Sequence, residues 1–290
     1  MDNPQGWTRT KDDYVDWAHA NTLPHAQKAI EVTPVPVNKK PLRLLDVACG
    51  TGVVTETLAQ KYPDVKDAVI LATDFAQGMV DHVEMNKRNR GWENVEAMVM
   101  DATAMDLPDS SMDVIYCVFG VMLMPSSEKA LSEMYRVLEE GGSVSIVTWH
   151  SQDVFSIFGE ASAKVNASAQ KSDASSIEEE TAKVLAAPTG GRPQAAKTWM
   201  DLEFCQEKLE AAGFKDVKGF QEKGVFKIRD IKGYMGMVVR NPGMATMAAN
   251  WSPEQVQEFQ DIAIRLIKEK YGDQEEYAMN VVSNILYARK

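Results

Sequence analysis

The stretch from Leu44 to Gln60, LLDVACGTGVVTETLAQ, constrains the fold more than any other part of the chain. An apolar run of strand length leads into a Gly-x-Gly turn at Gly50 and Gly52, and a pattern with helical spacing follows. Glycines between a strand and a helix let a ligand approach the backbone, and the start of the helix offers free N–H groups. The stretch therefore predicts a ligand-binding strand–turn–helix unit.

Strand and helix patterns alternate through the region that contains this unit. Strands are predicted over residues 42–48, 68–75, 94–102, 112–124 and 143–149. Helices are predicted over residues 53–62, 76–91 and 128–142. Such alternation predicts a mostly parallel sheet with helices on both faces. Further on, helices at 201–214 and 252–272 flank a strand or hairpin at 215–227, and a last strand is expected at 277–290.

Four regions are predicted along the 290 residues. Residues 1–41 form an N-terminal helical lid, with a helix over 11–21 that Pro24 interrupts and a proline-rich linker over 33–41. Residues 42–150 form the cofactor-binding core. Residues 151–200, which are rich in small polar side chains, form an inserted cap. Residues 201–290 complete the core and include a methionine-rich helical substrate-cap segment at 230–271.

Composition narrows the classes of partner. The net charge of −11, from 31 basic and 42 acidic residues, argues against nucleic-acid binding. No apolar run reaches the roughly 20 residues that span a bilayer, and the N-terminus lacks the pattern of a secretory signal. We therefore expect a cytoplasmic monomer or homodimer that acts on a small molecule. The three cysteines and four histidines lack metal-ligand spacing, so no metal is expected.

Acidic residues indicate which ligand the glycine turn binds. The third glycine of the dinucleotide fingerprint is replaced by Thr55, and Asp46 lies inside the strand four residues before Gly50. A carboxylate there suits an ammonium group better than a pyrophosphate. Asp74 ends the second strand, where it can accept both ribose hydroxyls, and Asp101 with the following Ala102 can accept the exocyclic amine of adenine. The ligand inferred has an amino acid end, a ribose and an adenine, and S-adenosylmethionine fits this description.

Four segments in this order resemble the successive motifs of class I S-adenosylmethionine-dependent methyltransferases of the ubiquinone/menaquinone-biosynthesis type. They are LDVACGTG, ATDFAQGM, MDATAMDLPDSSMDVIYCVFGVMLM and EMYRVLEEGGSVSIVTW. The whole chain is also similar to fungal small-molecule methyltransferases related to gliotoxin bis-thiomethyltransferase, through GWENVEA, TWHSQDVFSIF and KLEAAGFKDVK. The resemblance implies a Rossmann-like seven-stranded sheet in the order 3-2-1-4-5-7-6 with the last strand antiparallel.

The resemblance also assigns roles to residues of the predicted cofactor site. Ala48, Gly50 and Gly52 would approach the methionine moiety, together with Asp46. Asp74 would bind the ribose, and Phe75, Met79, Asp101 and Ala102 would surround the adenine. Val118 and Phe119 would lie near the sulfonium, and Tyr14 of the N-terminal helix would close over the cofactor.

The acceptor side is expected to be apolar. Met122, Met124, Trp149 and Met235 are predicted to line the substrate pocket, because methionines adapt to bulky apolar ligands. His150, just past the fifth strand, is the candidate catalytic base, although an aligned and activated methyl donor can react without one. These features favour methyl transfer to a thiol or hydroxyl of a small metabolite. The alternatives are a protein or RNA methyltransferase, or a non-methylating cofactor-binding protein on the same fold.

Overall fold

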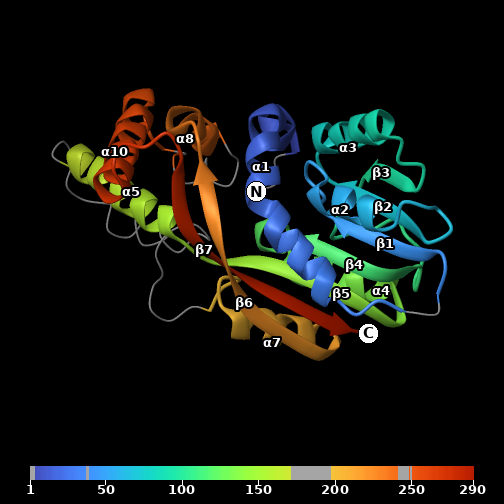
Figure 1. Ribbon diagram of the computed structural model, residues 1–290. Coiled ribbons are helices and arrows are strands. Elements are labelled where there is room, and N and C mark those ends of the chain that lie inside the picture. Colours follow the sequence, from blue (N-terminus) through green and yellow to red (C-terminus); the bar gives the residue numbers. More distant parts are fainter. Residues whose placement is uncertain (1–3, 37–38, 171–196, 241–247, 249) are drawn as a thin grey trace.

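The computed structural model describes residues 4–36, 39–170, 197–240, 248 and 250–290 (Figure 1). The described strands form one seven-stranded sheet in the order β3-β2-β1-β4-β5-β7-β6. They are β1 (Leu42–Val47), β2 (Ala68–Asp74), β3 (Val95–Val99), β4 (Met112–Val118), β5 (Leu138–Gln152), β6 (Lys215–Ile228) and β7 (Tyr277–Arg289). The first five strands are parallel, and β7 is antiparallel to both β5 and β6. This topology confirms the predicted sheet.

The position of each strand follows from its side chains. All seven residues of β4, MDVIYCV, are buried, as expected for a central strand that is covered on both faces. By contrast, β6 lies at one edge of the sheet, and most of its side chains are exposed or half-buried. Its lysines and glutamates suit an edge strand, because charges discourage pairing with another chain.

Helices cover both faces of the sheet (Figure 1). One face packs against α1 (Pro4–Val32), α2 (Val53–Lys61) and α3 (Gln77–Arg90), through a cluster that includes Ala29, Leu58 and Val83. The other face packs against α4 (Ser127–Val137) and α7 (Leu202–Ala211), through Met134 and Leu209 among others. In α4 the buried residues recur at helical spacing, so that one stripe of the helix faces the sheet.

A third apolar cluster lies beyond the sheet, where β6 and β7 extend outward (Figure 1). It joins the ends of these strands to α5 (Asp153–Gln170), α8 (Ile231–Arg240) and α10 (Pro253–Tyr271), which together we call the helical lobe. The predicted helix start at Ser252 is confirmed: Ser252 and Gln255 form a reciprocal capping box, with a proline at the first helical position. Fully buried Phe259 fills the centre of the lobe.

Three predicted boundaries were wrong. First, α1 continues through Pro24 to Val32, because Ala26, Ala29 and Ile30 are buried against the sheet and this packing outweighs the missing backbone donor. Second, α4 ends at Val137 rather than at the glycine pair. The glycine pair belongs to β5, which begins at Leu138, directly after the helix. A Cβ on Gly142 would stand 2.8 Å from the Asp113 carbonyl oxygen.

Third, β4 ends at Val118, and a short 3₁₀ helix, η1 (Val121–Leu123), takes up residues that the apolar run had assigned to the strand. The segment 215–227, predicted as a strand or a hairpin, lies within the single strand β6.

The region predicted as a cap, 151–200, is described only in part. Residues 153–170 form α5, which packs against α10 within the helical lobe, whereas residues 171–196 lie outside the described residues. Within the described residues, no helix is both long enough and apolar enough to cross a bilayer.

Candidate functional site

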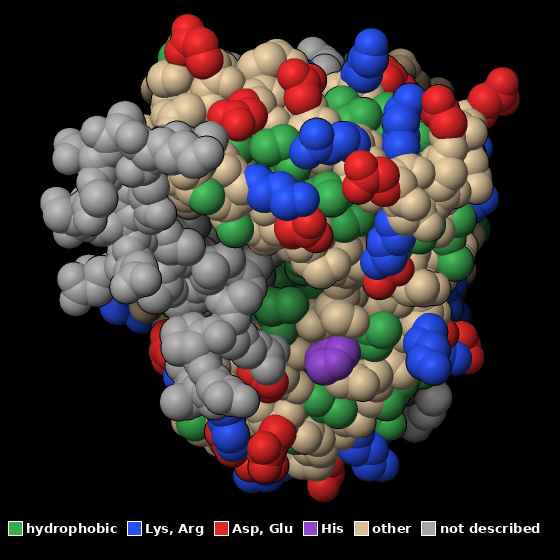
Figure 2. Space-filling view, turned by 90° about the vertical axis from the view of Figure 1, so that its left-hand side faces the viewer, with side chains coloured by type: hydrophobic (Ala, Val, Ile, Leu, Met, Phe, Trp, Pro, Cys, Tyr) green, Lys and Arg blue, Asp and Glu red, His purple; other side chains and the backbone are tan. Residues whose placement is uncertain are grey.

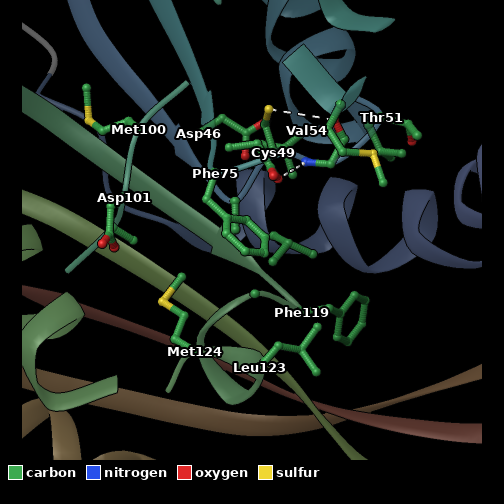
Figure 3. Close-up of a pocket in the computed structure, with 18 of the residues that line it drawn as sticks. Asp46, Cys49, Thr51, Val54, Phe75, Met100, Asp101, Phe119, Leu123 and Met124 are labelled. Carbon is green, nitrogen blue, oxygen red and sulfur yellow. Dashed lines mark hydrogen bonds between the residues drawn. The ribbon is translucent and has the colours of Figure 1, made fainter. Parts of the chain in front are cut away.

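A cavity of about 370 Å³ lies at the carboxyl ends of β1, β2, β3 and β4 (Figure 3). Its lining comes from these strand ends and the segments that follow them, and from residues of α1, α2 and α3. Open α/β sheets bind their ligands at this edge, and the volume lies in the usual range of about 300–1,000 Å³ for small-molecule pockets. The cavity is therefore the candidate ligand site.

The glycine turn forms one wall of this cavity. Between β1 and α2 the backbone is left-handed at Ala48 (φ 54°), Gly50 (φ 53°) and Gly52 (φ 86°). A Cβ on Gly50 would meet nothing within 4 Å, so this glycine is required by its backbone conformation alone. A Cβ on Gly52 would stand 2.9 Å from Val83 Cγ2, so this glycine also allows α3 to pack closely against the turn.

The loops after β1 and β4 meet at the bottom of the cavity. A Cβ on Gly120 would stand 2.7 Å from Ala48 Cβ and 3.0 Å from Cys117 Sγ. Only a residue without a side chain fits there, so the two loops hold each other in place. Sequence reasoning did not single out Gly120, because this constraint arises between loops more than 70 residues apart.

Asp46 lines the cavity from inside β1. Its Oδ2 accepts hydrogen bonds from the Thr55 backbone N–H (3.0 Å) and the Thr55 hydroxyl (2.6 Å). Thr55, which breaks the dinucleotide fingerprint, therefore orients this carboxylate. Burial raises the pKa of Asp46 to about 7, and the bonds from Thr55 oppose that shift. A buried carboxylate of this kind is stabilised as an anion when a cation binds beside it.

Asp74 ends β2 and connects it to the glycine turn. Its Oδ2 accepts from the Gly50 backbone N–H (3.0 Å), and its Oδ1 accepts from the Ala76 N–H (2.9 Å). Burial raises the pKa of Asp74, and these backbone donors counter the shift. Asp74 thus fixes the shape of the turn in addition to the ligand role that the sequence predicted for it.

Asp101 follows β3 and is exposed at the far end of the cavity. Its Oδ1 accepts from the backbone N–H and the hydroxyl of Thr103, both at 2.8 Å. These two bonds hold the carboxyl group and the following Ala102 at the rim. Figure 3 shows Asp101 well separated from Asp46.

The remaining wall is apolar and comes from the segment after β4. Figure 3 shows Phe119, Leu123 and Met124 together, across the cavity from Cys49 and Thr51. Phe119 adopts φ 58°, and its ring stacks on Trp149 of β5 with 3.5 Å between the centroids and 11° between the planes. The cavity therefore has an acidic side at the glycine turn and an apolar side after β4.

Most of the residues predicted to bind the cofactor line this one cavity. They are Asp46, Ala48, Gly50, Asp74, Phe75, Met79, Asp101, Ala102, Val118 and Phe119. Gly52 belongs to the turn but does not line the cavity. Tyr14 lies within α1, and its side chain is outside the described residues. Which atoms of the cofactor each residue contacts stays a prediction.

The predicted acceptor residues are more scattered. Met124 lines the cavity, Met122 packs against the core under α1 and α2, and Trp149 stands behind Phe119. Met235 does not line the cavity: it is fully buried in the helical lobe. The methionine-rich sequence of α8 gave no information about which face of that helix is covered.

His150, the candidate base, also lies away from the cavity lining. Its Nδ1 is hydrogen-bonded to the Met200 carbonyl oxygen at 2.8 Å. His150 lies where the pairing of β5 with β7 shifts register, so strict alternation of side chains does not apply there. Trp149, the residue before it, is the one that stacks on Phe119 of the cavity wall.

Several residues of the lining escaped sequence reasoning. They are Thr22, Cys49, Thr51, Val53, Val54, Val99, Met100, Thr103, Gly120, Leu123 and Pro125. Cys49, Thr51, Val53 and Val54 flank the predicted glycine turn, so their proximity to the Gly-x-Gly motif could have indicated them. Thr22 carries no such signal, because its place depends on how α1 packs across the sheet.

The lining fits S-adenosylmethionine better than a phosphate ligand. Three carboxylates, Asp46, Asp74 and Asp101, line the cavity, and no lysine or arginine does so among the described residues. Such a charge distribution disfavours pyrophosphate and favours a cationic ligand with hydroxyl and amino donors. No group of three or more metal-ligating side chains occurs among the same residues.

Sheet order, glycine turn and strand-end carboxylates together define the class I S-adenosylmethionine-dependent methyltransferase fold. Within that class, residues 44–142 match the family described as methyltransferase domain, so this part of the chain is a methyltransferase domain. S-adenosylmethionine is accordingly its cofactor, and the residues of the cavity suit it.

Curated relatives agree with the family match, and a solved structure agrees with the fold. Methyltransferase tpcH of Aspergillus fumigatus is 32% identical over 39% of this chain and 40% of its own length. Demethylmenaquinone methyltransferase of Clavibacter sepedonicus is 29% identical over 61% of this chain and 66% of its own length. The chain thus matches less than two thirds of either relative. The [4+2]-cyclase SpnF shares the fold, with a TM-score of 0.51 and 20% identity over 92% of this chain and 80% of SpnF.

Proposed function

We propose that this protein transfers the methyl group of S-adenosylmethionine to a thiol or hydroxyl of a small, largely apolar metabolite. The observation that carries the proposal is the two-sided cavity. Its acidic side at Asp46 and Asp74 suits the donor, and its apolar side at Phe119, Leu123 and Met124 suits an apolar acceptor. The relative from Clavibacter sepedonicus is named for a small, apolar acceptor, demethylmenaquinone, which supports an acceptor of that size and polarity.

The residues on the acidic side would hold the donor in a fixed orientation. Asp46 would take its ammonium group, Asp74 its ribose hydroxyls, and Asp101 with Ala102 the edge of its adenine. The bound donor supplies an activated methyl group that needs no further activation by the protein. Orientation and exclusion of water are then the main tasks of the chain, and alignment alone can lower a barrier by about 7–11 kcal/mol.

The choice of a thiol or an acidic hydroxyl follows from the titratable groups that line the cavity. Among the described residues these are Asp46, Cys49, Asp74 and Asp101. The three carboxyl groups accept hydrogen bonds from the chain and would also contact the donor, and burial raises the pKa of Cys49 well above its ordinary value. An acceptor that ionises readily by itself, such as a thiol, therefore suits the site better than an alcohol or an amine, which needs a base.

The test is incubation of the purified full chain with methyl-labelled S-adenosylmethionine and a matched panel of acceptors. The panel pairs each apolar thiol with the phenol, alcohol and amine of the same carbon skeleton, so that only the acceptor atom varies. We expect label in the thiols and phenols, and none when Asp74→Ala replaces the parent protein. Transfer to protein or RNA, or cofactor binding without transfer to any acceptor, would contradict the proposal.

A further inference from the structure

His25 lies behind the apolar wall of the cavity, beside the stacked rings of Phe119 and Trp149. The centroid of its ring is 5.6 Å from that of Phe119 and 5.4 Å from that of Trp149, at interplanar angles of 81° and 86°. Since the Phe119 and Trp149 rings stack with only 3.5 Å between their centroids, these distances place His25 beside the stack. The imidazole therefore contacts both rings from the same side.

Residues of β6 and β7 surround the His25 ring. Its Nδ1 is hydrogen-bonded to the hydroxyl of fully buried Ser283 at 2.8 Å. A Cβ on Gly224 would stand 3.1 Å from the Cε1 and Nε2 atoms of His25, so this edge strand carries a glycine where the ring needs space. Only 2% of His25 is exposed. These contacts leave the ring a single position.

Phe119 needs such support, because its backbone is left-handed. A non-glycine residue with φ near 58° is strained by about 1–2 kcal/mol relative to ordinary backbone conformations. Neighbouring contacts must therefore stabilise Phe119 in this conformation. The Phe119 N–H donates to the Val147 carbonyl at 2.9 Å, which fixes the backbone. Contacts with Trp149 and His25 fix the ring of Phe119. Phe119 lines the cavity, whereas His25 and Trp149 do not.

We propose that His25 is a positioning residue for methyl transfer: its ring holds Phe119 against Trp149 and so fixes the apolar wall that the acceptor meets. The role in transfer rests on the proposed function, whereas the position of the Phe119 ring can be measured without any acceptor. Burial lowers the pKa of His25 to about 4, so the ring is neutral near pH 7. A neutral ring adds no positive charge behind a wall that would face a cationic donor.

The first experiment measures the ring stack directly, by 19F NMR of the full chain labelled with 5-fluorotryptophan. Trp149→Phe identifies the Trp149 resonance among those of the six tryptophans. Phe119→Leu shows where this resonance moves when the stacked ring is lost. We expect His25→Ala to move it toward the Phe119→Leu position. An unmoved resonance in folded His25→Ala protein would overturn the proposal.

A double variant separates the ring of His25 from its hydrogen bond. His25→Phe with Ser283→Ala keeps an aromatic ring beside the stack and removes both polar partners together, which avoids a buried unpaired hydroxyl. We expect its Trp149 resonance to stay near the parental position. If the double variant moves the resonance as far as His25→Ala does, the imidazole rather than the ring is required. His82→Ala, at a buried histidine of α3 away from the cavity lining, is the matched control and should leave the resonance unchanged.

The second experiment uses thiophenol as the acceptor. His25→Ala should raise the KM for thiophenol about tenfold, as expected when two aromatic contacts are lost. The affinity for S-adenosylhomocysteine, measured by calorimetry, should change less than about twofold. The double variant should restore the KM. A fall in kcat with unchanged KM would indicate a general loss of structure and overturn the positioning role. Failure of the parent protein to methylate any acceptor would count against the proposed function alone, and the NMR result would still decide where His25 holds the ring.

Discussion

The two sides of the cavity are built in different ways. On the acidic side, Asp46, Gly50 and Asp74 come from adjacent strands within 30 residues of sequence, and hydrogen bonds to backbone N–H groups hold them. On the apolar side, the wall at Phe119 depends on Trp149 from β5 and on His25 from α1. Its support comes from ring packing between distant parts of the chain. The comparison suggests that the donor side tolerates changes elsewhere in the protein, whereas the acceptor side responds to changes in α1, β6 and β7.

The largest effect is expected from Asp74→Ala. The change removes the acceptor of the Gly50 and Ala76 N–H groups as well as the predicted ribose ligand. Buried hydrogen bonds to a charged group contribute about 1.5–3 kcal/mol, so affinity for S-adenosylhomocysteine should fall about 100-fold. Calorimetry measures the affinity. An unchanged affinity would contradict both the ribose assignment and the role of Asp74 in shaping the turn.

Gly120→Ala tests a place where the loops of the two sides touch. The new methyl group would stand 2.7 Å from Ala48 Cβ, and overpacking of this kind costs about 1–3 kcal/mol. We expect the free energy of unfolding, measured by denaturant titration, to fall by about 2 kcal/mol. Ala48→Gly removes the opposing methyl group and should restore part of the loss in the double variant. Additive effects of the two substitutions would show that the loops do not constrain each other.

The pH dependence of cofactor binding sharpens the comparison further. Burial raises the pKa of Asp46 from about 3.8 in the unfolded chain to about 7 in the free folded protein. The contribution of Asp46 to folding stability is therefore fully present below pH 3.8 and is lost as the pH rises through 7. Binding of an ammonium group requires the ionised form. Affinity for S-adenosylhomocysteine should therefore fall about tenfold for each pH unit below 7. Asp46→Asn should weaken binding and flatten this dependence. A flat profile in the parent protein would contradict the assignment.

Met124→Ala should give the smallest effect, and only on the acceptor side. Met124 lines the cavity and is half-buried. Removing its thioether should raise the KM for an apolar acceptor about threefold. This corresponds to a fraction of the roughly 1.5–3 kcal/mol gained when an apolar side chain is fully buried. Affinity for S-adenosylhomocysteine should stay unchanged. Met235→Leu, in the helical lobe, is the matched control and should alter neither quantity. If Met124→Ala weakened the binding of the acceptor and of S-adenosylhomocysteine equally, the two sides of the cavity would not be distinct.

The same contrast explains what could be predicted from the sequence. Asp74 and Asp101 were found because each stands at the end of a predicted parallel strand, and such ends share one edge of the sheet. Asp46 was found because it lies inside the first strand, four residues before Gly50 of the glycine turn. The seven-stranded order came from the resemblance of four motifs, and the structure confirms it.

Contacts between distant segments could not be read in this way. Whether Trp149 or His150 faces the cavity depends on the register of β5, and Met235 is buried because of how α8 packs. His25 was not singled out, since nothing nearby in the sequence indicates that Phe119 lies beside it. Pro24 seemed to end the first helix, because the energy of burying the next turn is invisible in the local sequence.

The continuity of β5 and β7 has a consequence for motion. Their ladder runs without a linker from Ser143 and Arg289 within the core to Gln152 and Val281, beside the helical lobe. Trp149 pairs with Ser283 within this ladder, just before a shift of register. A rigid swing of the helical lobe away from the sheet would have to break these backbone hydrogen bonds. Any opening of the apolar side therefore has to come from movements smaller than a domain hinge. Helix α1 is joined to β6 and β7 through side-chain hydrogen bonds of Asn21 and His25, so it can move without breaking the sheet.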